Sequence, residues 1–104
     1  MVRAEIKKII LNYRVLLERA NIPVKRVVLF GSYARGTERK DSDIDLGIIS
    51  EEFGQDEMKE SSRINFLKWK LDNRIEAHPI SSKDYDTIAT PFINEVRKYG
   101  VEVS

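Results

Sequence analysis

Two aspartates separated by one residue, Asp43 and Asp45, are the side chains of this chain best suited to chemistry. They stand at the start of an apolar run that extends to position 49, and successive side chains of a strand point to opposite faces. The two carboxylates are therefore expected side by side on one face, where they repel each other unless a proton or a cation lies between them. This spacing predicts a metal site, and Mg²⁺ carrying a nucleotide is the simplest occupant.

A glycine and a serine, Gly31 and Ser32, follow directly after the apolar run 27–30. Glycine lets backbone amides approach a ligand closely, and amides at the start of a helix favour phosphate oxygens. Ser32 adds a hydroxyl donor, and Arg35 adds a guanidinium suited to phosphate. Phosphoryl transfer needs an aligned triphosphate and metal ions about 3.5–4 Å apart, so a phosphate turn beside paired carboxylates indicates that chemistry.

The elements that position these residues follow from the spacing of apolar side chains. We expect helices over 2–20, 57–71 and from Pro91 to Tyr99, a brief helix within 31–35, strands over 25–30, 43–49 and 74–80, and a final extended piece over 101–103. The first strand is apolar on both faces and is expected to be central. This order favours an α/β (α+β) fold, a small mixed sheet flanked by helices.

The helix over 57–71 has a less regular pattern than the others. Met58, Ile64, Leu67 and Leu71 are expected on its buried side, with Phe66 and Trp69 in the core or facing a partner; residues 81–90, including Asp84 and Asp86, are expected to form a polar loop.

Composition sets limits on the class of protein. The 104 residues predict one small domain, residues 1–104, and 41% hydrophobic with 34% charged residues is typical of a soluble globular chain. The 18 basic and 17 acidic residues give a net charge of +1, so no direct nucleic-acid binding is expected. The absence of cysteine excludes thiol catalysis and thiolate metal sites. No stretch approaches the roughly 18–20 apolar residues of a membrane span, and a cytoplasmic protein is expected.

The combined pattern is similar to a known family. Gly31-Ser32, ten intervening residues and Asp43-x-Asp45 resemble the signature of the DNA polymerase beta nucleotidyltransferase superfamily. Within it, Gly-Ser-Tyr-Ala-Arg-Gly at 31–36 and Ser-Asp-Ile-Asp-Leu at 42–46 resemble the minimal nucleotidyltransferases of bacteria and archaea, the antitoxin-like partners of small helical HEPN proteins. The resemblance covers nearly the whole chain and implies a polymerase-beta-like nucleotidyltransferase fold.

The resemblance also implies a third acid on the following strand. Glu76 lies in the matching segment and is predicted to be the third metal ligand and a catalytic carboxylate, although it is one methylene longer than the aspartate of some members. Asp72 is the rival, but beside Asn73 it is typical of a turn. His78 shares a face with Glu76 in a regular strand, and a supporting role is expected for it rather than that of a catalytic base.

The activity that the resemblance implies is transfer of a nucleoside monophosphate from an NTP, with ATP as donor, to a hydroxyl group. The implied acceptor is a tyrosine of a HEPN partner, and the implied cofactor is two Mg²⁺ ions. Gly31 and Ser32 would hold the β and γ phosphates with help from Arg35, while Asp43 and Asp45 would hold both metals. The third acid would position or deprotonate the acceptor hydroxyl.

Other interpretations stay open. The alternatives are a solvated strand edge for Asp43 and Asp45, a surface ion pair for Arg35, and the exposed face of a strand for Glu76. The alternative function is a catalytically idle antitoxin that neutralises a HEPN-type partner by covering it. Transfer to a small molecule is disfavoured, because the aminoglycoside-modifying relatives use an additional helical domain. A domain of this size leaves its cleft open, so a helical partner, or a second copy in a homodimer, is expected to complete it.

Overall fold

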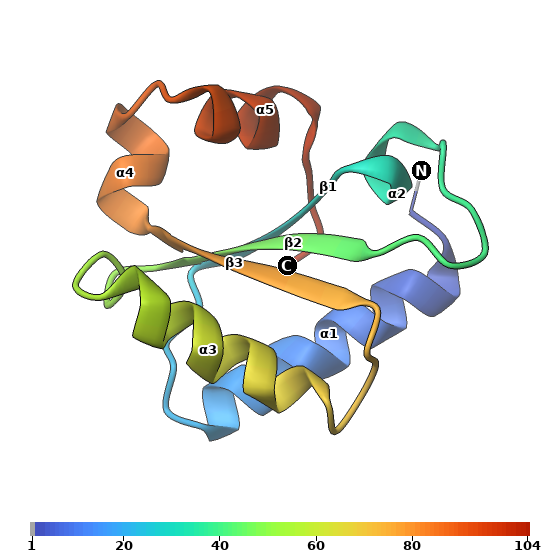
Figure 1. Cartoon of the computed structure of the whole chain (residues 1–104), viewed down its shortest axis with the longest axis horizontal. Coiled ribbons are helices and arrows are strands. Elements are labelled where there is room, and N and C mark those ends of the chain that lie inside the picture. Colours follow the sequence, from blue (N-terminus) through green and yellow to red (C-terminus); the bar gives the residue numbers. More distant parts are fainter. Residues whose placement is uncertain (1) are drawn as a thin grey trace.

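The computed structural model describes residues 2–104 and shows a four-stranded sheet with helices on both faces (Figure 1). The strand order is β3-β2-β1-β4. Strand β1 (Arg26–Phe30) runs antiparallel to β2 (Ile44–Ser50) and to β4 (Val101–Glu102), whereas β2 and β3 (Ile75–Ser81) are parallel. The predicted mixed sheet and the central position of β1 are therefore confirmed.

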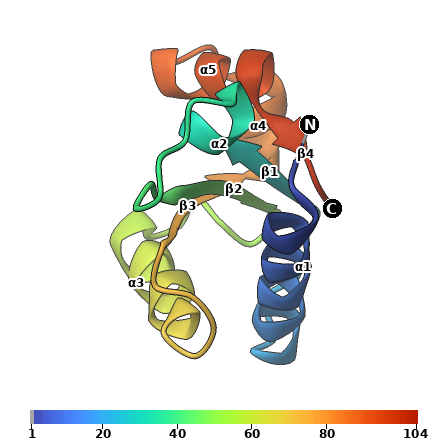
Figure 2. The same ribbon diagram turned by 90° about the vertical axis from the view of Figure 1, so that its right-hand side faces the viewer.

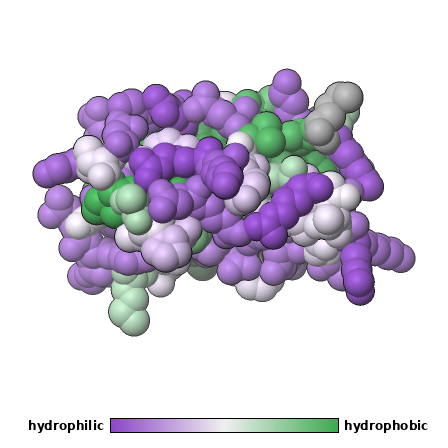
Figure 3. Space-filling view, turned by 90° about the horizontal axis from the view of Figure 1, so that it is seen from above, coloured by the Kyte–Doolittle hydropathy of each residue, from purple (hydrophilic) through white to green (hydrophobic). Residues whose placement is uncertain are grey.

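Helices α1 (Ala4–Arg19) and α3 (Glu57–Lys68) cover one face of the sheet, and α4 (Ser82–Thr87) and α5 (Pro91–Tyr99) cover the other (Figure 2). The short α2 (Ser32–Arg35) lies on the same side as α5. The expectation of a loop after β3 is wrong, because Ser81 Oγ accepts the backbone N–H of Asp84 at 3.0 Å and starts α4. Seen from the side of α4 and α5, the surface is mainly hydrophilic (Figure 3).

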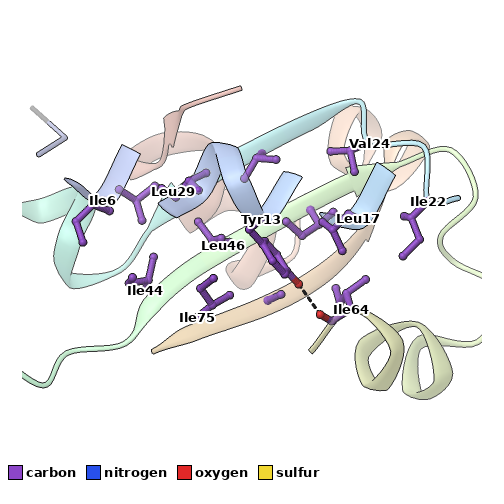
Figure 4. Close-up of a cluster of buried hydrophobic side chains, with 14 of the residues drawn as sticks. Ile6, Tyr13, Leu17, Ile22, Val24, Leu29, Ile44, Leu46, Ile64 and Ile75 are labelled. Atoms are coloured by element: carbon purple, nitrogen blue, oxygen red, sulfur yellow. Dashed lines mark hydrogen bonds between the residues drawn. The ribbon is translucent and has the colours of Figure 1, made fainter. Parts of the chain in front are cut away.

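The larger core lies between the sheet and the pair α1 and α3 (Figure 4). Tyr13 is fully buried there, and its hydroxyl donates to the carbonyl oxygen of Ile64 at 2.6 Å. That bond satisfies a polar group that burial would otherwise penalise, and burial raises the pKa of Tyr13 well above its usual value. A smaller core joins the other face of the sheet to α5 and contains Val28, Phe30, Ile49, Ile80, Ile93 and Val96. The two cores fix the sheet between its helical layers.

Helix α3 is shorter than predicted and buries fewer side chains. It starts at an Asp56 cap, ends at Lys68, and Ile64 is its one buried residue. The expectation of a buried Met58 is wrong, because this side chain is 81% exposed; Phe66 and Trp69 are also exposed and therefore lie outside the core. None of the helices in residues 2–104 has the length and apolar character needed to cross a bilayer.

Two strand boundaries differ from the predicted ones. Strand β2 begins at Ile44, so Asp43 lies one residue before it rather than inside it. Strand β3 runs from Ile75 to Ser81, one residue later at each end than the predicted 74–80, and it includes Pro79. Because β3 is at the edge of the sheet, it tolerates a residue without an N–H group.

Candidate active site

Asp45 lies on the middle one of three adjacent strands, at the end of the sheet where the candidate site residues come together. In the sheet register it pairs with Phe30 of β1 on one side and with Glu76 of β3 on the other. Directly paired residues of neighbouring strands have side chains on the same face, so Asp45 and Glu76 lie together. Gly31 follows Phe30 in the chain, which places the glycine turn beside the acids. The fold thus brings together the residues that the sequence analysis selected at these positions.

Gly31 cannot be replaced by another residue without distortion. Its backbone has φ +73° and ψ −151°, a conformation that is essentially restricted to glycine. A Cβ atom at this position would also overlap the carboxylate of Asp45. Ser32 then begins the single turn of α2, which ends at Gly36 in the left-handed conformation. Because Gly31 has no side chain, the backbone at the end of β1 lies closer to the carboxylate of Asp45 than it could with any other residue at this position.

The carboxyl groups of the site lie close together, and the pKa of Glu76 is raised as a result of this environment. Burial raises this pKa above its usual value, and so do a hydrogen bond with the carboxyl group of Asp43 and the negative charge of Asp45. Asp43 itself is exposed. Although Asp43 lies before β2, its carboxyl group still reaches Glu76, whereas the possible metal ligands that lie within 4.8 Å of one another belong to Asp45, Glu76 and His78. A divalent cation would relieve their mutual repulsion.

His78 completes this group of side chains. Its Nε2 atom lies 3.8 Å from Asp45 Oδ1 and 3.8 Å from Glu76 Oε1, and it is buried without a hydrogen-bond partner in residues 2–104. The possible ligand atoms of the three residues all lie within 4.8 Å of one another. An unpaired buried nitrogen between two carboxylates fits a divalent cation, whose ligands include oxygen and imidazole nitrogen.

Asp72, the rival for the third acid, has a different role. Arg74 donates to both of its carboxylate oxygens, from Nε at 3.1 Å and Nη2 at 2.9 Å, and the backbone N–H of Arg74 donates at 2.9 Å. The hydrogen bonds from Arg74 lower the pKa of Asp72. Its oxygens are committed to this turn, whereas those of Glu76 face the other acids.

Arg35 makes its contacts with α5. Its guanidinium forms an ion pair with Glu95 and lies 5.5 Å from the centre of the Tyr99 ring. The surface ion pair considered in the sequence analysis is therefore present. A contact between Arg35 and a phosphate would require the guanidinium to exchange Glu95 for the ligand.

Comparison with known proteins identifies the family. The family described as nucleotidyltransferase domain matches residues 13–99, and the chain belongs to it. A protein of Methanocaldococcus jannaschii named "Putative protein adenylyltransferase" is 44% identical over 80 residues, which cover 75% of this chain and 77% of that protein. The chain is thus a minimal nucleotidyltransferase, and the predicted membership of the nucleotidyltransferases is confirmed.

Solved structures share the fold. A toxin–antitoxin complex crystallised with AMP-PNP matches with a TM-score of 0.60 at 24% identity, over 89% of this chain and 71% of the other. A protein from Sulfolobus solfataricus described as a putative nucleotidyltransferase matches with a TM-score of 0.59 at 17% identity, over 92% and 73% of the two chains. A mutant of the MntA-HpeT toxin–antitoxin matches with a TM-score of 0.57 at 20% identity, over 89% and 70%. The predicted nucleotidyltransferase fold is therefore confirmed.

Proposed function

We propose that this chain transfers AMP from ATP to a hydroxyl group of a protein partner and acts as an antitoxin. The observation that carries the proposal is the register of Asp45 with Glu76 beside the Gly31 turn, which groups acids and a phosphate turn at one end of the sheet. The M. jannaschii relative, named as a protein adenylyltransferase, supports a protein acceptor. The toxin–antitoxin structures that share the fold support a toxin as the partner. The acceptor we infer is a tyrosine of a small helical HEPN-type toxin.

The metal-binding residues in this proposal are Asp43, Asp45 and Glu76, which would hold two Mg²⁺ ions. Metal ions neutralise charge on the phosphates and lower the pKa of a bound hydroxyl. Asp43 directly precedes β2 and Asp45 is its second residue, and in this proposal the two carboxylates would share both ions. Glu76 comes from the adjacent β3 and completes one of the two sites.

The nucleotide would lie against the turn between β1 and α2. The glycine backbone of Gly31 lets the turn pass directly beside Asp45, so its backbone N–H groups would meet phosphate oxygens next to the acids, and Ser32 adds its hydroxyl. These two residues would hold the β and γ phosphates. Arg35 would assist after leaving Glu95.

The transfer step is an in-line displacement at the α phosphorus. The acceptor oxygen forms a bond to this phosphorus, the bond to the oxygen that bridges the α and β phosphates breaks, and pyrophosphate leaves with that oxygen. The proton of the acceptor hydroxyl passes to the carboxylate of Glu76.

The partner protein would supply the acceptor hydroxyl. We infer that residues 1–104 act as one minimal nucleotidyltransferase domain, and that a second chain closes the cleft and presents the acceptor. Mass spectrometry of the partner after co-expression with wild type or Asp43→Asn tests this. The proposal expects a mass increase of one AMP on a partner tyrosine with wild type only. An unmodified partner in a tight complex would instead indicate the idle antitoxin.

A further inference from the structure

The imidazole of His78 has a buried nitrogen, Nε2, that makes no hydrogen bond with any group of residues 2–104. We propose that His78 Nε2 is a direct ligand of the metal ion held by Asp45 and Glu76, and that this nitrogen makes the site prefer Mn²⁺ over Mg²⁺. The inference rests on the proposed function only in that it places a metal at these two carboxylates.

The position of His78 in β3 aims its ring at the acids. His78 follows Glu76 by two residues, so both side chains lie on the same face of the strand. On β2, the residue paired with His78 is Gly47, which has no side chain to stand between the ring and Asp45. The imidazole nitrogen therefore reaches both carboxylates at 3.8 Å.

Two aromatic rings hold the imidazole in this orientation. The ring of Phe30 lies 5.2 Å from that of His78 and the ring of Phe92 lies 5.5 Å from it, measured between centroids. The two phenylalanine rings also contact each other, at 5.6 Å. A side chain already fixed in place loses little conformational freedom when it binds a ligand, so this packing favours coordination by Nε2.

The distances suit coordination better than a hydrogen bond. At 3.8 Å, the nitrogen is too far from either carboxylate for a hydrogen bond. Metal–ligand bonds of about 2.0–2.2 Å place neighbouring ligand atoms about 3 Å apart, so the imidazole nitrogen needs to approach each carboxylate by only about 1 Å to share an ion with it. A shared cation thus accounts for the unpaired nitrogen and for the clustered acids together.

The type of donor decides which ion is preferred. Mg²⁺ prefers oxygen ligands, whereas imidazole nitrogen suits first-row transition ions. An all-carboxylate site gains no nitrogen bond when Mn²⁺ replaces Mg²⁺. At this site His78 adds such a bond, and the gain should disappear when the nitrogen is removed.

Electron spin-echo spectroscopy of Mn²⁺ bound to the metal-free protein tests the proposal, because nitrogen coordination gives ¹⁴N modulation. We expect modulation in wild type and none in His78→Phe, which keeps a ring between Phe30 and Phe92. By titration calorimetry, His78→Phe should bind Mn²⁺ about tenfold more weakly while its affinity for Mg²⁺ changes less than about threefold. His78→Gln provides a second variant if the phenylalanine protein fails to fold.

The contradicting results separate this inference from the proposed function. Bound Mn²⁺ without ¹⁴N modulation in wild type would overturn the role of His78 and leave the carboxylate site intact. Equal losses of Mn²⁺ and Mg²⁺ affinity in His78→Phe would overturn the preference. Undiminished Mn²⁺ binding by Asp45→Asn would contradict the carboxylate site, and with it the proposed function.

Discussion

The carboxylate of Asp45 occupies the space in which a side chain at Gly31 would begin. The contact joins the end of β1 to the start of β2, where antiparallel pairing sets Asp45 opposite Phe30. Because the glycine backbone also has a conformation that other residues avoid, the turn is fixed by two independent constraints. The glycine turn after β1 and the carboxylate of Asp45 are thus a single structural unit.

Gly31→Ala should therefore disturb both stability and transfer. We expect a loss of about 1–3 kcal/mol from backbone strain, with a further loss from displacement of Asp45, and strongly reduced nucleotidyl transfer. The control is Gly36→Ala, which has the same φ of +73° but nothing within 4 Å of the added Cβ. It should lose about 1–2 kcal/mol and keep its activity. Denaturant unfolding and a transfer assay measure the two effects; equal activities in the two variants would refute the role of the contact.

Asp43→Asn should abolish transfer without weakening the fold. Even residues that only orient metal ligands contribute about 10–100-fold, so loss of a ligand should reduce the rate at least about a hundredfold. The melting temperature should stay the same or rise, because the substitution removes a negative charge beside Asp45 and Glu76. Asp41→Asn, in the exposed loop, is the matched control and should remain active. Full activity of Asp43→Asn would refute the metal assignment.

Separate substitutions of Asp72 and Glu76 should show which of the two residues is the third acid of the site. Glu76→Gln should lose transfer at nearly unchanged stability, whereas Asp72→Asn should retain transfer and lose up to about 1 kcal/mol, since Arg74 is partly exposed. The reverse pattern of transfer rates would make Asp72 the third acid.

The stabilising effect of Asp72 should also depend on pH. Its pKa is lowered in the folded protein by the hydrogen bond from Arg74, so its contribution is present above the unfolded pKa of about 3.9 and is lost as the pH falls through the folded value. The difference in unfolding free energy between wild type and Asp72→Asn should therefore be largest near neutral pH and shrink in acid. A difference that is independent of pH between 2 and 7 would contradict the ionic origin of the effect.

Arg35 and Glu95 should have opposite effects on nucleotide binding. Arg35→Ala removes a guanidinium proposed to reach phosphate and should raise KM for ATP several-fold. Glu95→Gln frees that guanidinium from its ion pair and should leave KM unchanged or lower it. Steady-state kinetics measure both. An unchanged KM in Arg35→Ala would show that Arg35 is simply a surface ion-pair residue.

The sequence predicts the parts of the fold that depend on local pattern. The apolar spacing of α1 and the apolar run of β1 give these elements to within two residues, and Thr90 with Pro91 marks the start of α5 correctly. Polar α4 has no apolar periodicity and depends on the cap by Ser81. The exposure of Met58 reflects how α3 sits on the sheet, which its own sequence does not encode.

The residues of the candidate site can likewise be predicted from the sequence where they form a local pattern. Gly31, Asp43 and Asp45 form a pattern close in the sequence, and the strand register brings Glu76 to them. The unpaired nitrogen of His78 depends on rings from β1 and α5, and the ion pair of Arg35 joins residues 60 positions apart. Such contacts arise only when distant elements pack. The two-residue spacing of Glu76 and His78 is the local sequence feature that indicates His78 as a further residue of the site.

The central claim is best tested with ATP labelled at the α phosphate, incubated with the protein, a divalent metal and the product of the adjacent reading frame. Wild type and Asp43→Asn should be compared, with ATP labelled at the γ phosphate as the control for phosphorylation. The account predicts that α label moves to the partner with wild type only and that γ label does not. A partner that binds tightly but remains unlabelled would contradict nucleotidyl transfer as the function of this chain.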